Sequence, residues 1–288
     1  MSYNITGHTG LCALLGSPVS HSISPAMHNE AFRLLSLDYA YLAFDVGTDN
    51  LKTAVEGLKA LGVKGFNLTM PDKNLMAELC DELSPAARLT SAVNTVVNDG
   101  GRLIGHTTDG IGYMRAAADA GVCLEHKTMT LLGAGGAATA VVVQAALDGL
   151  KEIRIFNIKD SFFSRMEALS EKLNAETGCR VTVHDLADKA ALKASVHTSD
   201  ILTNCTSVGM APNTEACLID DDSVFHSGLI VSDIIYNPKE TLLLKKARQN
   251  GLKTFNGLYM LLYQGAEAFR LWTGHDMPTE AVKAKFFV

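Results

Sequence analysis

Residues 130–138 read Thr-Leu-Leu-Gly-Ala-Gly-Gly-Ala-Ala, and this stretch decides the fold. An apolar run at 127–133 predicts a buried strand, and the Ala- and Val-rich run at 137–150 predicts a helix. The turn between them fits the pattern G-x-G-x-x-A at Gly133, Gly135 and Ala138. In such a turn the first glycine permits the tight bend and the second lets the backbone approach a pyrophosphate. The small third residue lets the helix pack closely on the strand.

The start of the helix predicted at 137–150 supplies free N–H groups and the positive end of a dipole, which together bind phosphate. A glycine turn with a purely structural role would read the same way. The strand predicted at 152–157 completes a strand-turn-helix-strand unit and favours dinucleotide binding. We therefore expect a Rossmann-type domain around this stretch.

Strand-like and helix-like stretches alternate on both sides of this unit and form two blocks. In the first block, the patterns predict strands at 11–16, 39–46, 65–70 and 92–98 and helices at 25–37, 50–61 and 74–83. In the second, they predict further strands at 180–184, 201–204 and 229–233 and helices at 112–120, 162–174, 189–196 and 241–250. A further helix is predicted from 258 to 273 and onward, and it need not belong to the second block. Such alternation is typical of α/β domains whose parallel sheets are covered by helices on both faces.

The composition limits the classes of partner. Of 288 residues, 47% are hydrophobic and 19% are charged, which is typical of a folded protein with one or two domains. A protein with a net charge of −6 does not attract nucleic acid or an anionic membrane electrostatically, so neither partner is expected. The six cysteines include no C-x-x-C pair, which argues against a disulfide scaffold and a zinc ribbon. Neither a membrane-spanning apolar run nor a signal-peptide pattern occurs, so we expect a cytoplasmic protein.

Two serines precede the helix predicted at 25–37. Ser24 stands before Pro25, which is the arrangement of an N-cap followed by proline at the first helical position. Capping does not account for Ser22. Two hydroxyls beside the positive end of a helix would also hold a carboxylate, so the stretch fits either a plain cap or a carboxylate-binding site.

Lys73 and Asp109 are the candidates for acid–base chemistry. Lys73 closes the stretch 67–73 after a predicted strand end, where ligands bind in α/β proteins, and Asp109 lies at the junction of the two blocks. Oxidation of an alcohol needs a base that takes the hydroxyl proton while a hydride leaves the carbon. Either residue would serve as this base, with the other orienting it. The chain contains neither a G-x-S-x-G nucleophile stretch nor an H-E-x-x-H pair, so we expect no metal site.

The residues after the strand predicted at 152–157 bear on the choice of nicotinamide cofactor. A Rossmann site for NAD places an acid near this strand end, where it accepts a hydrogen bond from the ribose 2′-hydroxyl. Asp160 takes that place, and its carboxylate would repel the 2′-phosphate of NADP. Lys159 acts in the opposite sense, although a lysine beside an aspartate is commonly a solvated surface pair. We predict NAD as the preferred cofactor and leave the use of NADP open.

Eight ordered stretches carry a family resemblance. They are Gly16-Ser-Pro-Val-Ser-His-Ser-Ile-Ser-Pro25, Asn67-Leu-Thr-Met-Pro-Asp-Lys73, Ala92-Val-Asn-Thr95, Thr108-Asp-Gly110, Gly133-Ala-Gly-Gly136, Asn204-Cys-Thr-Ser-Val-Gly-Met210, Ile235-Tyr-Asn-Pro238, and Gln264-Gly-Ala266 through Trp272-Thr-Gly274. Because these stretches are spread from residue 16 to residue 274, the chain resembles the shikimate and quinate/shikimate dehydrogenases along essentially its whole length.

The resemblance implies an N-terminal α/β substrate domain completed by C-terminal helices, residues 1–110 with 256–288, and a dinucleotide-binding domain, residues 111–255. It implies reversible oxidation of the ring C3 hydroxyl of shikimate or quinate, to 3-dehydroshikimate or 3-dehydroquinate. By motif position, Lys73 and Asp109 would be the catalytic pair, and the substrate would contact Ser22, Ser24, Thr69, Asn94, Tyr236 and Gln264. The cofactor site would be lined by Gly133, Ala134, Gly135, Gly136, Ala137, Asn157, Ile158, Lys159, Asp160, Ser207, Ile234, Ile235, Tyr236, Asn237 and Gly257.

Two positions depart from the family pattern. Thr107 stands where the family usually carries Asn in G-x-N-T-D-G, which affects the local support of Asp109. Ile158 stands where strictly NADP-using members carry Arg, and with Asp160 this looks like the NAD-using quinate/shikimate branch. We therefore expect a quinate/shikimate dehydrogenase that prefers NAD. The alternatives are a shikimate-only NADP enzyme of aromatic amino-acid biosynthesis and a non-catalytic ligand sensor on the same fold, and a homodimer is left open.

Overall fold

The computed structural model describes residues 5–287. Contacts within the chain divide it into two units. Unit 1 is Met1–Thr108 with Leu262–Val288, and unit 2 is Asp109–Leu261. Each unit contains one six-stranded sheet, so the expected two-domain α/β fold is confirmed. The assignment of functional domains to 1–110 with 256–288 and to 111–255 stays a prediction. Across residues 5–287, no helix combines the length and the apolar character needed to cross a membrane.

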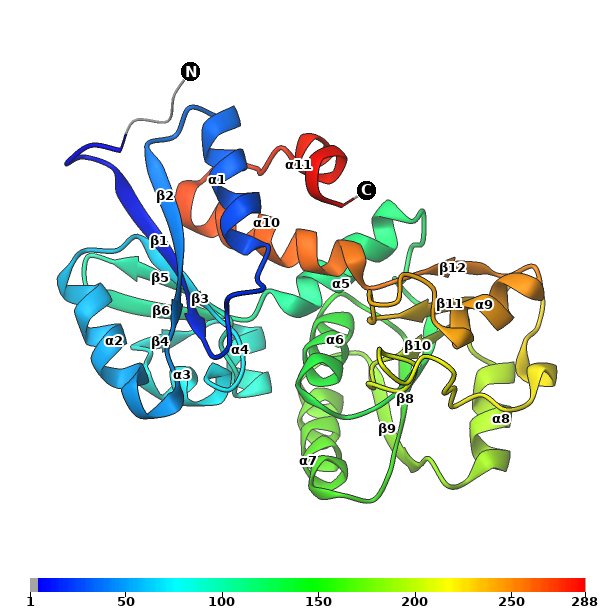
Figure 1. Cartoon of the computed structure of the whole chain (residues 1–288). Coiled ribbons are helices and arrows are strands. Elements are labelled where there is room, and N and C mark those ends of the chain that lie inside the picture. Colours follow the sequence, from blue (N-terminus) through cyan, green and yellow to red (C-terminus); the bar gives the residue numbers. More distant parts are fainter. Residues whose placement is uncertain (1–4, 288) are drawn as a thin grey trace. The chain divides into compact units, whose positions relative to one another are not determined.

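Unit 1 is built on a mixed sheet with the strand order β2-β1-β3-β5-β6-β4 (Figure 1). Its strands are β1 (Gly10–Gly16), β2 (Tyr39–Asp45), β3 (Gly65–Leu68), β4 (Glu82–Leu83), β5 (Thr95–Asp99) and β6 (Arg102–His106). β5 is antiparallel to both β3 and β6. The expectation of a wholly parallel sheet is therefore wrong for this unit, because the tight Gly100-Gly101 turn returns β6 directly alongside β5.

Helices cover both faces of this sheet. They are α1 (Ser24–Leu34), α2 (Thr48–Ala60), α3 (Lys73–Leu79), α4 (Pro85–Thr90), most of α10 (Leu258–Thr273) and α11 (Thr279–Phe286). On one face, α2 and α3 bury Leu51 and Met76 in a cluster with Phe66 of β3. On the other face, α10 packs through Trp272, whose Nε1 donates to the Val96 carbonyl oxygen (2.9 Å). Successive strand residues point to opposite faces, which is why β3 contributes to both layers.

Unit 2 is built on a wholly parallel sheet with the order β12-β11-β10-β7-β8-β9 (Figure 1). Its strands are β7 (Thr128–Leu132), β8 (Glu152–Asn157), β9 (Arg180–Asp185), β10 (Ile201–Asn204), β11 (Ile230–Asp233) and β12 (Lys253–Phe255). Its helices are α5 (Asp109–Asp119), α6 (Gly136–Leu147), α7 (Ser161–Glu176), α8 (Lys189–His197), the 3₁₀ turn η1 (Asp222–Val224) and α9 (Leu242–Gln249). The strand order reverses between β7 and β10, which is the doubly wound Rossmann arrangement that the sequence predicted.

Several short elements differ from the expectation. The helix predicted at 74–83 ends at Leu79, because Glu82 pairs with Ile104 of β6 and forms β4 there. Ser84 then caps α4 by accepting from the Ala87 N–H group (3.3 Å). β4, β6, β12 and α4 were not predicted. Each is at most six residues long. β4 and β12 also depend on pairing with strands that are not joined to them by a tight turn, β6 and β11 respectively.

Candidate active site

The Gly-rich turn joins β7 to α6 in unit 2. Gly133 has a φ of +106°, which favours glycine, and its N–H donates to the Phe156 carbonyl oxygen (2.8 Å). α6 begins at Gly136, and Ala138 is fully buried. A Cβ on Gly135 or Gly136 would meet no heavy atom of the described residues within 4 Å. The turn therefore has both the open space and the N–H donors that a pyrophosphate needs.

The loop after β8 also begins a helix. Asp160 is the N-cap of α7, and its Oδ1 accepts from the N–H groups of Phe162 (2.9 Å) and Phe163 (3.1 Å) and from Nδ2 of Asn157 (3.0 Å). Among the described residues, all three bonds go to Oδ1, so the carboxylate keeps Oδ2 for a further donor. Lys159 forms its ion pair with Asp185 (3.5 Å). This cap was not predicted from the sequence, although an aspartate before a helical run is its usual signal.

The remaining predicted cofactor residues follow the carboxyl ends of β10, β11 and β12. Ser207 comes shortly after β10, and residues 234–237 follow β11 directly. Gly257 comes after β12, and a Cβ there would collide with the Ile234 carbonyl. The carboxyl ends of parallel strands lie at one edge of the sheet, where doubly wound folds bind their ligands. The structure thus places all the predicted cofactor residues along this edge.

Two buried polar residues at the same edge were not among the predicted site residues. Asp233 ends β11 and Asn204 ends β10, and the two are register partners in neighbouring strands. Burial raises the pKa of Asp233 to about 6. Hydrogen bonds from Ile235, Thr241 and Asn204 act in the opposite direction and lower this pKa. Desolvation therefore outweighs the hydrogen bonds. A polar residue at the end of each of two apolar strands was the available signal.

Ser22 and Ser24 come after the carboxyl end of β1 in unit 1. The N-cap of α1 is Ile23, which already has helical dihedral angles and makes no side-chain cap bond, so the prediction that Ser24 is the cap is wrong. Instead, Ser22 Oγ accepts from the Ser24 N–H group (3.3 Å). The helix starts one residue earlier than expected, and this turns Ser24 into a largely buried residue of its first turn.

A buried polar network holds the neighbouring strand ends of unit 1. The Tyr41 hydroxyl donates to Asn67 Oδ1 (2.7 Å), and Asn67 Nδ2 donates to the Asn94 carbonyl oxygen (3.0 Å) and to Thr95 Oγ1 (2.9 Å). Asn94 Oδ1 in turn accepts from the Thr108 N–H group (2.8 Å). Burial keeps the pKa of Tyr41 well above its usual value, so the phenol retains its proton as a donor. Asn94 thus holds Thr108, the residue before Asp109, next to the position where Thr107 departs from the family pattern.

The other predicted residues lie on elements of both units. In unit 1, Thr69 follows β3, Lys73 is the first residue of α3, and Gln264 lies in α10. In unit 2, Asp109 is the first residue of α5, and Tyr236, which follows β11, has an exposed fraction of 48%. β1 and β3 are parallel neighbours, so the stretches carrying Ser22, Ser24, Thr69 and Lys73 all leave the same edge of the first sheet.

Comparison with known proteins identifies the family to which this chain belongs. Residues 14–96 match the family described as the shikimate dehydrogenase substrate binding domain, and residues 257–285 match the shikimate 5′-dehydrogenase C-terminal domain. A protein of Streptococcus uberis named shikimate dehydrogenase (NADP(+)) is 51% identical over 100% of this chain and 98% of its own. The chain belongs to the shikimate dehydrogenase family.

Two more members of the shikimate dehydrogenase family agree in sequence and in structure. A shikimate dehydrogenase (NADP(+)) of Streptococcus pyogenes is 53% identical over 98% of each chain. The crystal structure of a shikimate 5-dehydrogenase from Listeria monocytogenes, in complex with shikimate and NAD, is 49% identical. It superposes with a TM-score of 0.96 over 99% of this chain and 98% of its own. The family resemblance stated from the sequence motifs is therefore confirmed, whereas the names of the two streptococcal relatives do not support the NAD-using quinate branch.

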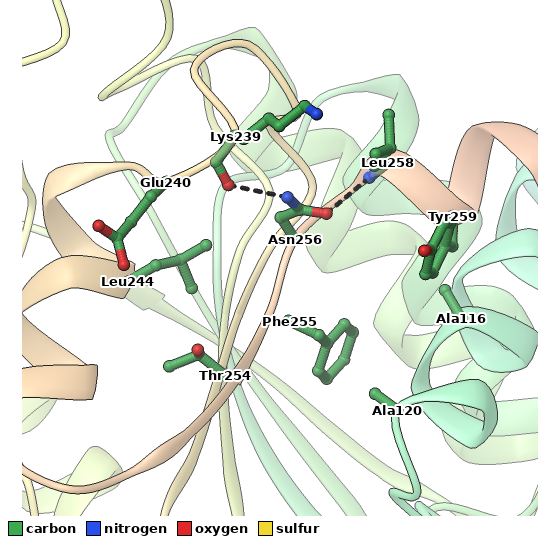
Figure 2. A pocket seen from close by; sticks show the side chains of 10 residues that line it. All are labelled: Ala116, Ala120, Lys239, Glu240, Leu244, Thr254, Phe255, Asn256, Leu258 and Tyr259. Atoms are coloured by element: carbon green, nitrogen blue, oxygen red, sulfur yellow. Dashed lines mark hydrogen bonds between the residues drawn. The ribbon is translucent and has the colours of Figure 1, made fainter. Parts of the chain in front are cut away.

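A pocket of about 320 Å³ in unit 2 contains none of the residues predicted for a shikimate dehydrogenase site (Figure 2). It is lined by Ala116, Ala120, Lys239, Glu240, Leu244, Thr254, Phe255, Asn256, Leu258 and Tyr259. Figure 2 shows Asn256 donating from Nδ2 to the Lys239 carbonyl oxygen (2.8 Å) and accepting at Oδ1 from the Leu258 N–H group (3.1 Å). Asn256 thereby fixes the chain next to Gly257. Within residues 5–287, no group of three or more His, Cys, Asp or Glu is placed to hold a metal ion.

Proposed function

We propose that this member of the shikimate dehydrogenase family reversibly transfers a hydride between a nicotinamide cofactor and the ring C3 hydroxyl of shikimate. The observation that carries the proposal is the identity of 51% over 100% of the chain to a protein named shikimate dehydrogenase (NADP(+)). The two sheet edges support it. One offers a turn with room for a pyrophosphate, and the other offers hydroxyl, amide and ammonium groups that suit a small hydroxy-acid.

In the proposed reaction, Lys73 and Asp109 handle the proton of the reacting hydroxyl. The cofactor, when bound along the carboxyl edge of the unit 2 sheet, supplies the hydride acceptor. A hydroxyl that loses a hydride from its carbon must also lose its proton, so one of the two side chains accepts the proton while the other orients it. Each residue begins a helix, which holds its backbone more firmly than a long loop would. Asp109 also stands in the first turn of α5, where the helix dipole favours an acidic side chain.

We assign the substrate carboxylate to Ser22 and Ser24, whose two hydroxyls flank the start of α1. Thr69, Asn94 and Gln264 would contact the ring hydroxyls, and Tyr236 would lie nearby. The Asn94 amide is already oriented by its bonds with Thr108, so it would meet a ring hydroxyl without first changing rotamer. Quinate carries the same kind of carboxylate and ring hydroxyls, and it is the second candidate substrate because Ile158 and Asp160 look like the quinate/shikimate branch.

We propose NADP as the cofactor, with NAD as the second candidate. The relatives at 51% and 53% identity carry NADP(+) in their names. The observation that favours NAD is the exposed Asp160 carboxylate. Its Oδ1 is committed to the helix cap, but its Oδ2 would accept from a ribose 2′-hydroxyl and would repel a 2′-phosphate.

Initial rates with shikimate or quinate, each with NADP or NAD, test the proposal through the absorbance of the reduced cofactor. Turnover of shikimate with NADP alone supports the main proposal. Turnover of both acids with NAD supports the second candidates instead. A folded protein that binds shikimate and cofactor but turns over neither acid would contradict the proposal and favour a ligand sensor.

A further inference from the structure

The carboxylate of Asp233 is the centre of a buried hydrogen-bond cluster in unit 2. The residue is only 1% exposed. Its Oδ1 accepts from the Ile235 N–H group (3.0 Å), and its Oδ2 accepts from the Thr241 hydroxyl (2.8 Å). Nδ2 of Asn204 donates to both oxygens, at 3.2 Å from Oδ1 and 3.1 Å from Oδ2. One carboxylate therefore bonds its own loop, the start of α9 and the end of the neighbouring strand.

Asn204 extends this cluster into the loop that follows β10. Its Oδ1 accepts from the N–H group (3.1 Å) and the hydroxyl (2.7 Å) of Thr206, and its Nδ2 also reaches the Val208 carbonyl oxygen (3.2 Å). The Thr206 hydroxyl accepts from the Val208 N–H group (3.1 Å). These bonds enclose Ser207, so the conformation of a predicted cofactor residue depends on the amide that Asp233 orients.

The loop after β12 joins the same cluster through Ile235. While Asp233 binds the Ile235 N–H group, the Ile235 carbonyl oxygen accepts from the Gly257 N–H group (3.1 Å). Gly257 also packs so closely on Ile234 that only glycine fits there. Three loops that carry predicted cofactor residues are thus tied to one carboxylate.

We propose that Asp233 is a positioning residue for cofactor binding, which holds the loops after β10, β11 and β12 in the conformation that receives the nicotinamide cofactor. The inference rests on the proposed function, since it takes these loops as the cofactor site. Asp233 does not itself touch the cofactor; it acts through Asn204 and Ile235.

The donor count explains why this position needs a carboxylate. Every group that faces Asp233 is a donor: the Ile235 N–H, the Asn204 amide and the Thr241 hydroxyl. An asparagine side chain would have to place its own NH₂ group where one of the two oxygens now lies. In either orientation this NH₂ would face the Asn204 amide, which spans both oxygens. The substitution therefore preserves the shape of the side chain but breaks the cluster.

Asp200 offers a matched control in the same sheet. It precedes β10 at its amino end, and its carboxylate accepts from the Thr128 N–H group (2.8 Å) and from Lys127 Nζ (3.0 Å). Asp200→Asn thus weakens a carboxylate–backbone bond at the opposite end of the strand, away from every predicted cofactor residue. A purely structural role for Asp233 would make the two variants behave alike.

The experiment measures the Kd of NADPH and of NADH by titration of their fluorescence, together with KM for shikimate and Tm. We expect Asp233→Asn to raise the Kd of the cofactor that the unsubstituted protein prefers by about tenfold, at temperatures well below its Tm. Asp200→Asn should lower Tm but leave this Kd within about twofold. Thr241→Ala removes one bond to Oδ2 and the α9 cap to the Leu244 N–H group (3.4 Å) but leaves the carboxylate, so it keeps the test available if Asp233→Asn does not fold. It should raise the same Kd by about threefold.

The outcomes separate this inference from the function on which it rests. Normal cofactor binding by the unsubstituted protein, with an unchanged Kd in the folded Asp233 or Thr241 variants, overturns the positioning role and leaves the function standing. The absence of cofactor binding by the unsubstituted protein overturns the proposed function and this inference with it. A raised Kd in these variants and an unchanged Kd in Asp200→Asn supports both.

Discussion

Asp160 combines two roles that a pair of substitutions separates. Its Oδ1 caps α7 through the N–H groups of Phe162 and Phe163, and its charge follows the strand end where a dinucleotide ribose is expected. Asp160→Ala removes the cap and the charge together. Asp160→Asn removes the charge alone, because asparagine caps helices about as well as aspartate. The two variants should share every effect of the charge and differ by the effect of the cap.

The contacts of Asp160 set the size of each effect. Loss of a cap that satisfies two N–H groups costs about 1 kcal/mol of the free energy of unfolding. For a unit the size of Asp109–Leu261, this lowers Tm by about 2–4 °C in Asp160→Ala. Asp160→Asn should stay within about 0.5 kcal/mol of the unsubstituted protein. Removal of one exposed carboxylate near a 2′-phosphate stabilises bound NADP by roughly 1 kcal/mol. In both variants, the ratio of kcat/KM with NADP to kcat/KM with NAD should therefore rise about five- to tenfold.

Thermal unfolding followed by circular dichroism measures the cap, and initial rates with each cofactor at fixed shikimate measure the charge. Asp188→Ala is a matched control, since Asp188 caps α8 in the same unit by accepting from the Ala191 N–H group (2.9 Å). It should lower Tm by a similar amount and leave the cofactor ratio unchanged. An unchanged ratio in both Asp160 variants would refute the electrostatic reasoning. A shift in Asp160→Ala alone would assign the effect to the helix start.

Three further predictions concern unit 1. Lys73→Ala should lower kcat at least about 100-fold and leave the cofactor Kd within about twofold, as expected for the loss of one of the two residues that handle the proton. A near-normal kcat would remove Lys73 from the proton transfer. Ser24→Ala should raise KM for shikimate about tenfold at nearly constant kcat, since it removes a hydrogen bond to a carboxylate; initial rates that give an unchanged KM would place the carboxylate elsewhere. Burial lowers the pKa of His28 from 6.5 to about 3, so its neutral form contributes stability above pH 6.5 that is lost as pH falls. Between pH 6.5 and pH 5, the free energy of unfolding measured with urea should fall by about 2 kcal/mol more in the unsubstituted protein than in His28→Phe. Equal falls in the two proteins would contradict this.

Sequence patterns predicted unit 2 more closely than unit 1. The strands at 152–157 and 201–204 were predicted with the bounds that the structure shows. Strands of a parallel sheet are buried on both faces, so each reads as a continuous apolar run between turn residues. The strands missed in unit 1 are short, and β4 has only two residues, Glu82 and Leu83. Such a strand exists because its partner β6 is present, and no local pattern announces it.

For the site residues, the sequence predicted which residues lie at strand ends but not which groups they contact. The motifs identified polar residues at strand ends, and the structure places them along one edge of each sheet. The motifs did not reveal that Asp160 caps a helix, that Ser22 rather than Ser24 makes the side-chain bond at the start of α1, or that Asp233 and Asn204 are paired. Each of these depends on the direction of a side chain or on the position of a neighbouring strand.

The sequence by itself determined the strand-turn-helix geometry around Gly133, the two-domain α/β class and the family, because these depend on local residue types and on their order along the chain. Only the tertiary structure decided which buried polar groups bond to one another. Asn67, Asn204 and Asp233 lie within or at the end of buried strands, and their partners come from chain up to 29 residues away. A polar group removed from water is costly unless a partner meets it, and that partner is supplied only when distant strands come together.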